Sequence, residues 1–357
     1  MARAPEAIFY PTYTPPYTPY QVDTGSTVDS EVKRIDSQRA ADNQSERRSI
    51  PRLITAVVRG PWWMLGFEKW WSLGLFVLCG GGAIAFCLAG AQKMSFQRLI
   101  ATTTPVEGYW YQRSPWKVFI MLHILTIIPA TFFSVFCFLP ISFKMWPRVH
   151  GAVGYIVSFL LVVGCVGGGV AARRAQGGEL GVQLGYYMLS LGSAASVIIG
   201  CIEGWRGAFD AHREWMLRAW IYNGALVTAH ATGAISAQMI TFISNYYTPM
   251  RCSEIRYLVS SDIVSSDFPL CSTPEAILSP DSQYLAVKAA WDEGKLGQSS
   301  AIRATFGMSM LLAIFLHCVG VEIYMRATRD ESRKLQDWSR KSRLRVTEPS
   351  GRPYLIP

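Results

Sequence analysis

The sequence predicts an all-α fold: a polytopic helical membrane protein whose six transmembrane helices form a bundle. The first observation is composition, because 50% of the 357 residues are hydrophobic and only 17% are charged, whereas soluble domains carry about a quarter charged residues. The second is that the apolar residues come in long blocks, each near the roughly 20 residues that cross a bilayer. Together they exclude a secreted disulfide-rich miniprotein, a disordered chain and an ordinary soluble enzyme.

The chain divides into three parts. Residues 1–60 are polar and open with a Pro/Tyr/Thr-rich run. They cannot bury enough apolar surface to offset the entropy of ordering, so we expect a disordered cytosolic segment. Residues 61–326 form the six-helix transmembrane domain, with a long hydrophilic loop at 245–302, and residues 327–357 form a basic cytosolic tail. The six apolar blocks are Trp71–Gln92, Trp116–Pro140, His150–Ala172, Gln183–Ile202, Trp215–Ile243 and Arg303–Met325.

The distribution of Lys and Arg predicts the orientation, because cytosolic flanks of membrane helices are enriched in both. The chain after Tyr324 carries nine Lys/Arg against four Asp/Glu, and the long loop is acidic on balance. We therefore expect a multi-pass protein of an endomembrane or the plasma membrane, with both termini in the cytosol and the loop in a lumen or outside. Arg173 and Arg174 are the exception, since this topology places them on the outer side.

Cysteine usage and net charge add two expectations. Six of the eight Cys lie inside apolar blocks, where they act as small hydrophobes. Cys252 and Cys271 share the loop that the charge bias places in an oxidising compartment, so we expect a disulfide, with two free thiols as the alternative. The net charge of +9 comes mostly from the flanks and favours anionic lipid headgroups as partners rather than nucleic acid.

All five histidines lie in or at the mouths of the predicted spans, where ionisable groups are functional candidates. A rise of 1.5 Å per residue puts His150 and His212 at the inner mouth and His123 and His230 in the outer half. His317 lies nearer the inner half. Two His pairs stacked in a helical bundle are typical of a haem-binding, cytochrome b-like redox protein. The alternative is that these residues bond headgroups, helix ends or neighbouring helices, or contact a substrate.

The separation within one helix weakens the haem interpretation. His212 and His230 are 18 residues apart, which is about five helical turns on one face, or ~27 Å. That exceeds the distance expected for two haems stacked within one bilayer.

A second polar cluster is predicted at the inner mouth. Glu203 directly follows the fourth block, Asp210, His212 and Arg213 lie just before the fifth, and Arg218 lies in its first turn. A carboxylate beside a histidine supports general acid–base catalysis, so His212, Arg218 and Glu203 are the candidate catalytic residues. The alternative is a set of interfacial ion pairs. No Cys/His spacing typical of a metal site occurs, and we expect no metal.

One stretch of the chain resembles a known family. His150-xxx-Gly154 opens one block, Gly177-Gly178 lies in the next link, and His212-Arg213-Glu214-Trp215-Met216-Leu217-Arg218 opens a later block. Together, over about residues 150–238, they resemble the predicted membrane proteins called domain of unknown function 2306. The resemblance implies a compact helical membrane unit, with no activity attached. Two positions depart from the family pattern: Gly151 replaces a basic residue, and His230 replaces an arginine.

Three functions follow as hypotheses. The first is a membrane protein that binds haem b through His150 and His212, and through His123 and His230. The second is a membrane-embedded isomerase or cyclase that acts on a lipophilic small molecule. The third is a non-catalytic scaffold or transporter-like protein. The long loop and the Pro/Tyr-rich N-terminal run lie outside the resemblance and favour a eukaryotic protein, for which a fungal secondary-metabolite pathway is one expectation.

Overall fold

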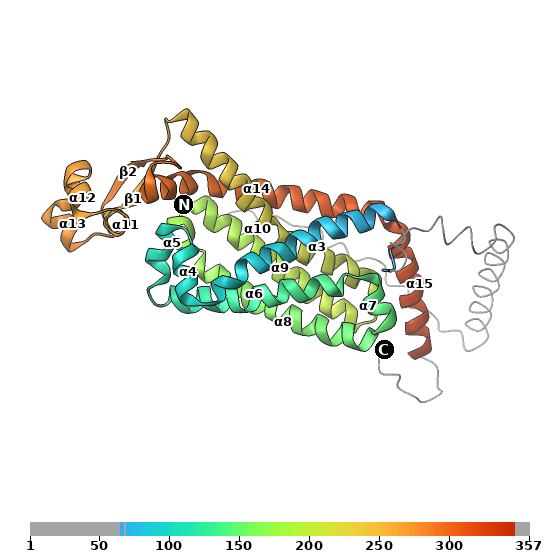
Figure 1. Cartoon of the computed structure of the whole chain (residues 1–357). Coiled ribbons are helices and arrows are strands. Elements are labelled where there is room, and N and C mark those ends of the chain that lie inside the picture. The colour runs from blue at the N-terminus through green and yellow to red at the C-terminus, as the bar shows by residue number, and fades with distance from the viewer. Residues whose placement is uncertain (1–64, 68, 347–357) are drawn as a thin grey trace, which may run out of the picture. The chain divides into compact units, whose positions relative to one another are not determined.

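The computed structural model describes residues 65–67 and 69–346, so the predicted disordered segment 1–60 lies outside the described residues. Within them, six helices are long and apolar enough to cross a membrane, and the all-α polytopic bundle is confirmed (Figure 1). These helices are α3 (Trp70–Ala91), α6 (Trp116–Cys137), α8 (Pro147–Ala171), α9 (Leu180–Trp205), α10 (Phe209–Ile243) and α14 (Gly294–Ala327).

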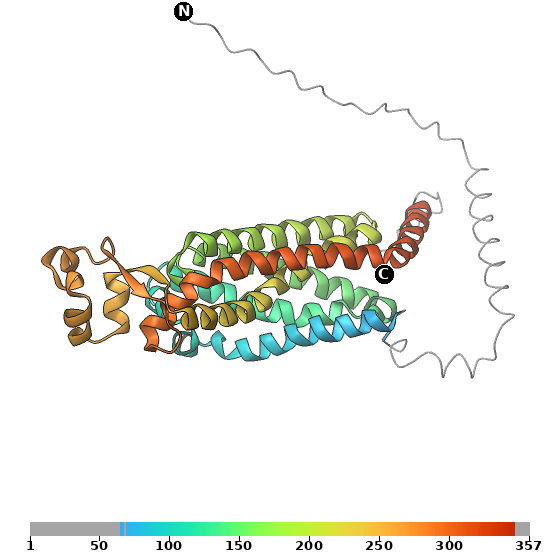
Figure 2. The same ribbon diagram turned by 90° about the horizontal axis from the view of Figure 1, so that it is seen from above.

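Neighbours in the bundle mostly follow chain order. α8, α9 and α10 are joined by short links and pack as sequential antiparallel neighbours, as short links favour. α3 packs on α6, α6 on α8, and α14 returns along α10 and also touches α9 (Figure 2). Consequently the first residues of α8 and of α10 lie at one end of the bundle.

Small residues allow the close approach of α10 to its neighbours. Its fully buried positions are Ala or Gly, such as Ala219, Ala229 and Gly233, and small residues are typical of interfaces between membrane helices. Large apolar side chains point outward instead, with 92% of Phe242 and 72% of Leu191 exposed. This pattern, apolar outside and small inside, is that of helices surrounded by lipid.

Short helices join the spans. α4 (Phe96–Thr102) and α5 (Pro105–Tyr111) lie between α3 and α6, and α7 (Pro140–Met145) lies between α6 and α8. α5, α7 and α8 each begin with proline, which suits the first helical position because the N–H there needs no intrahelical partner. The 3₁₀ turn η3 (Ala175–Gly177) lies in the α8–α9 link.

The segment between α10 and α14, residues 244–293, folds into a small unit that we call the loop domain. Strands β1 (Tyr247–Arg251) and β2 (Tyr284–Lys288) pair antiparallel, with Pro249 opposite Ala286. Between them lie α11 (Cys252–Leu258), α12 (Ser261–Asp267), η4 (Pro269–Ser272) and α13 (Pro274–Leu278). The predicted Cys252–Cys271 disulfide is present and joins α11 to η4.

The basic tail contains a helix that the sequence pattern did not predict. α15 (Arg329–Val346) lies at the end of the bundle away from the loop domain and turns off the axis of α14 (Figure 1). Trp338 stacks on Phe209 of α10 with ring centroids 4.4 Å apart. Arg213 pairs with Glu331 at 2.9 Å and donates to the hydroxyls of Thr328 and Ser332. These contacts hold α15 against the start of α10.

Candidate functional site

A small cavity of about 90 Å³ lies among α6, α8, α9 and α10, near the loop-domain end of the bundle. Much of its lining is apolar or small, including Ala171, Ala172 and Ala175 from the end of α8 and the link that follows. Its polar lining comes from five elements of the chain. These polar residues are Tyr111, His123, Cys165, Tyr186, Ser190 and Asn223.

His123 is fixed in this cavity by the facing helix. Its Nδ1 lies 2.7 Å from the carbonyl oxygen of Gly164 in α8. A carbonyl only accepts hydrogen bonds, so Nδ1 carries the proton and Nε2 keeps its lone pair. The ring fits because α8 has no side chain there: a Cβ at Gly168 would lie 2.7 Å from His123 Nδ1, and one at Gly167 would lie 2.8 Å from the Phe119 carbonyl oxygen. The histidine needs these glycines.

Two tyrosines line the same cavity. Tyr111 is buried and donates to Glu107 Oε1 at 3.4 Å. Burial, together with the Glu107 carboxylate, holds the pKa of Tyr111 well above its usual range, so this phenol stays protonated. The Tyr186 ring stacks on Phe306 with centroids 6.3 Å apart and an interplanar angle of 28°, and its hydroxyl has no hydrogen-bond partner among the described residues. The Tyr186 hydroxyl therefore donates to no described residue.

Glu107 joins this cavity to the α8–α9 link. Its carboxylate accepts from the hydroxyls of Thr103 and Thr104 at 2.7 and 2.6 Å, and from the main-chain N–H of Gln176 at 3.2 Å. The backbone at Gln176 is left-handed, with φ of 48°, a conformation that non-glycine residues adopt at an energetic penalty. The Glu107 carboxylate stabilises this turn above the cavity.

A buried ion-pair network covers the loop-domain end of the bundle. Glu254 has no exposed surface and accepts from Arg303 Nη2 at 2.8 Å, from Trp110 Nε1 at 2.8 Å and from Arg251 Nη1 at 3.4 Å. Arg303 also donates to the carbonyl oxygens of Gln176 and Pro249. The network thus ties α5, the α8–α9 link, the loop domain and α14 together.

Gly177 makes room for this network. Its φ is +79°, and a Cβ there would overlap the guanidinium of Arg303. Only glycine satisfies both conditions without strain. Sequence reasoning noted Gly177 but missed Glu107, Glu254 and Arg303, since no spacing in the sequence connects positions so far apart.

The histidines predicted at the inner mouth lie at the α15 end of the bundle. His150 Nδ1 lies 3.1 Å from the Ser142 hydroxyl in α7, and His212 Nδ1 lies 2.7 Å from the Gly200 carbonyl oxygen in α9. A Cβ at Gly204 would meet the His212 ring at 2.7 Å, so here too a histidine packs on glycine of the neighbouring helix.

The carboxylates and arginines around His212 pair elsewhere. Glu203 pairs with Arg206 at 3.0 Å, Arg218 pairs with Glu322 of α14 at 2.8 Å, and Asp210 accepts from Ser339 of α15. The candidate catalytic trio of His212, Arg218 and Glu203 is therefore not joined by hydrogen bonds. The arrangement corresponds to the ion pairs that the sequence left open as the alternative.

The two remaining histidines lie on α10 and α14. His230 donates within its own helix to the Leu226 carbonyl at 2.8 Å, and its exposed ring packs between Phe86 of α3 and Phe306 of α14. His317 bridges α14 to α10 with both ring nitrogens, at 2.7 Å from the Ile221 carbonyl and 2.9 Å from the Thr228 hydroxyl. His123 and His230, which the sequence paired by depth, contact different helices.

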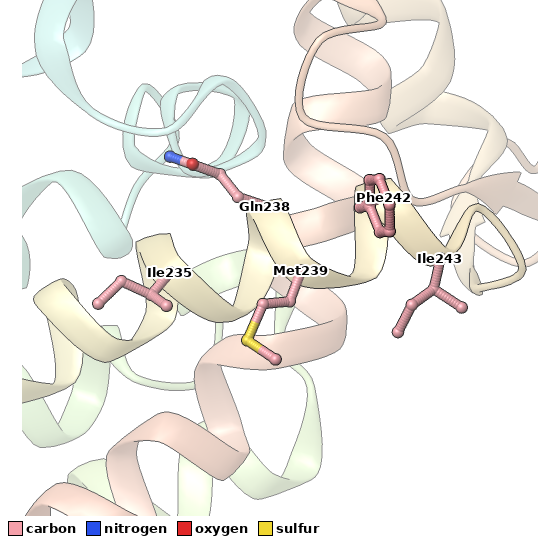
Figure 3. Close-up of a pocket in the computed structure, with 5 residues that line it drawn as sticks. All are labelled: Ile235, Gln238, Met239, Phe242 and Ile243. Carbon is pink, nitrogen blue, oxygen red and sulfur yellow. The ribbon is translucent and has the colours of Figure 1, made fainter.

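A second hollow lies on α10 alone and is shown in Figure 3. Ile235, Met239, Phe242 and Ile243 line it, and Gln238, its one polar member, points toward a neighbouring segment. The four apolar side chains are more than half exposed. A shallow apolar surface of this kind on a membrane helix fits acyl chains and offers no group for chemistry.

Among the described residues, no cluster of three or more His, Cys, Asp or Glu is arranged to hold a metal ion. Comparison of the chain with protein-family models, with curated proteins and with solved structures gives no match in any of the three.

Proposed function

We propose that this integral membrane protein binds the polar end of a lipophilic small molecule in the cavity lined by His123. One observation carries the proposal: the Nδ1–H of His123 is committed to Gly164, which leaves the Nε2 lone pair as an acceptor, in a cavity that Tyr186 also lines. An acceptor and a donor in one apolar setting suit a hydroxyl, carbonyl or carboxyl group.

The volume sets the size of the bound group. A water molecule occupies roughly 30 Å³ in the liquid, so a cavity of about 90 Å³ admits the polar end of a molecule and not the whole of it. The apolar remainder must lie between helices or in the lipid. This requirement favours a ligand that is itself dissolved in the membrane.

The same two groups support acid–base chemistry. His123 Nε2 can take a proton from a bound substrate, and the Tyr186 phenol can give one, which is the pair of steps that an isomerase or cyclase requires. The proposed enzymatic activity is therefore proton transfer on a membrane-dissolved substrate, with His123 as base and Tyr186 as acid.

Haem is less well supported at this cavity. The imidazole tautomer of His123 is the one that metal-ligating histidines adopt, with the second nitrogen held by a carbonyl. However, pockets for drug-sized ligands measure about 300–1,000 Å³, and a porphyrin is not smaller than these. We therefore favour the lipophilic molecule over the haem inferred from the paired histidines.

We also propose the membrane orientation and the family resemblance that the sequence indicates, on the residues that indicate them there. The basic tail that carries α15 and the disulfide in the loop domain both support a cytosolic tail and a loop domain in an oxidising compartment. The family resemblance is supported by position, since His150, His212 and Arg218 all lie near the α15 end of the bundle. These residues stabilise helix contacts in the proposal, and they do not form the catalytic site.

The test is the molecule that copurifies with the protein. Organic extracts of wild type and of the His123→Leu and Tyr186→Phe variants are compared by mass spectrometry. We expect a lipophilic species in wild type that falls about tenfold in each variant, the effect of losing one or two kcal/mol of hydrogen bonding.

Matched controls of the same residue types are available. His230→Leu removes a histidine of α10 that does not line the cavity, and Tyr187→Phe removes the hydroxyl of the residue after Tyr186, which bonds to Gln183. Both controls should retain the species. Equal amounts of the lipophilic species in wild type and in all variants would contradict the proposal. An intense haem absorption band that is present in wild type and lost in His123→Leu would show that the cavity binds haem instead.

A further inference from the structure

Arg174 occupies an unusual place in the α8–α9 link. Its guanidinium carbon lies 3.7 Å from the centroid of the Trp110 ring and 5.5 Å from that of Trp116. Trp110 is buried in α5, and Trp116 is the first residue of the membrane-spanning α6. Tryptophan is enriched where a span meets water, so Arg174 lies at the level of lipid headgroups.

Arg174 lacks the hydrogen bonds that its neighbours have. A guanidinium presents five N–H donors, yet Arg174 Nε is buried without a partner, and none of its donors has an acceptor among the described residues. Arg303, in contrast, donates to two carbonyls and to Glu254. Arg251 donates to Glu254 and to the carbonyl of Gly177. Of the three arginines, Arg174 is thus the one whose guanidinium has no hydrogen bond to a described residue.

The surrounding charge is positive on balance. Arg251 also lies over Trp110, at 5.4 Å, and Arg113 lies at 6.0 Å from the same ring. Glu254 is already shared by Arg303, Arg251 and Trp110. Asp281 accepts from Ser253. Burial and the proximity of Arg251 lower the pKa of Arg174, although Asp281 and Glu254 oppose this.

We propose that Arg174, with Arg251 beside it and with Trp110 and Trp116 around it, binds a phosphate group at the membrane surface. An arginine fork matches the oxygens of a phosphate and gives short, charge-assisted hydrogen bonds. The phosphate belongs to a phospholipid headgroup or to a free phosphate ion. The proposal is independent of the His123 cavity. It also gives a reason for Arg174 in the α8–α9 link, which the predicted topology places on the outer side of the membrane, where basic residues are less common.

The first test uses wild-type, full-length protein in a neutral detergent. Phenylglyoxal, which modifies guanidinium groups, is applied with and without dioctanoyl phosphatidic acid, and the modified peptides are mapped. We expect Arg174 to be protected, while the exposed Arg173 next to it is modified as before. Dioctanoyl glycerol, which lacks the phosphate, should give no protection.

The second test measures affinity. Titration of dioctanoyl phosphatidic acid should bind Arg174→Gln about tenfold more weakly than wild type, the effect expected for loss of charge-assisted hydrogen bonds. Arg173→Gln is the matched control and should bind as wild type does. Arg174→Lys keeps the charge and loses the fork, so it should fall between the two.

A parallel titration with inorganic phosphate, at constant ionic strength, distinguishes the sources. Binding of the ion as tight as that of the lipid assigns free phosphate, whereas binding of the lipid alone assigns a headgroup. Absence of Arg174 protection by either compound would overturn the proposal, and so would protection by dioctanoyl glycerol or equal affinities of wild type and Arg174→Gln.

Discussion

Arg303 of α14 and Glu254 of α11 form an ion pair at 2.8 Å in which the two side chains are 5% and 0% exposed. Both charges are hydrogen-bonded further, by main-chain carbonyls on one side and by Trp110 on the other. These additional hydrogen bonds offset the free-energy cost of removing the two charges from water. The pair joins the loop domain to the last span.

The Glu254→Gln substitution should destabilise the protein strongly. It leaves Arg303 buried without its counter-charge, and breaking a buried pair in this way costs about 3–5 kcal/mol. The measurement is the midpoint of thermal unfolding in detergent, with limited proteolysis of the loop domain as a second readout. Glu293→Gln, which removes the exposed partner of Lys288, is the control and should leave both readouts unchanged.

The Gly168→Ala substitution should loosen the α6–α8 contact. The added Cβ would lie 2.7 Å from the His123 ring, and overpacking of this kind costs about 1–3 kcal/mol. Gly169→Ala is the matched control, because a Cβ there meets nothing closer than Ser190 at 3.9 Å. Thermal stability is compared in the two variants, and an equal effect of both would contradict the packing described for His123.

The Cys252–Cys271 bridge should be detectable chemically. We expect neither cysteine to react with a maleimide when unreduced protein is denatured, and both to react after reduction. Because the bridge closes a segment with a sequence separation of 19, replacing both cysteines by serine should cost about 3 kcal/mol of loop-domain stability in the chain-entropy model. Labelling of both thiols before reduction would disprove the bridge.

Single cysteines should report the orientation. Ser266→Cys in α12 and Gln336→Cys in α15 place thiols at exposed positions on opposite ends of the bundle. A membrane-impermeant maleimide applied to intact cells should label the first if the protein is at the surface, and the second only after permeabilisation. Labelling of Gln336→Cys in intact cells, with Ser266→Cys labelled only after permeabilisation, would show the opposite topology. Labelling of both cysteines without permeabilisation would contradict the proposed topology.

The candidate site was only partly accessible from the sequence. The sequence indicates His123 because it is an ionisable residue inside an apolar block. It does not indicate the partner Gly164, because every residue has a main-chain carbonyl and no residue type shows which one accepts the hydrogen bond. Likewise Tyr111 and Tyr186 were passed over as two of 16 tyrosines. What makes them candidates is their meeting at one cavity, which depends on how the helices turn about their axes.

Local features of the sequence determined three parts of the fold. The length of the apolar blocks determined the six spans, the short links determined the antiparallel packing of successive spans, and two cysteines in one hydrophilic loop determined the disulfide. Tertiary structure alone decided how charged and aromatic side chains combine. Glu107, Glu254 and Arg303 come from segments far apart in the chain, and only the packing of α5, the loop domain and α14 brings them around the α8–α9 link. The physical reason is that a buried charge requires a partner at hydrogen-bond distance. Only the packing of segments that are distant in the chain determines which residue is that partner.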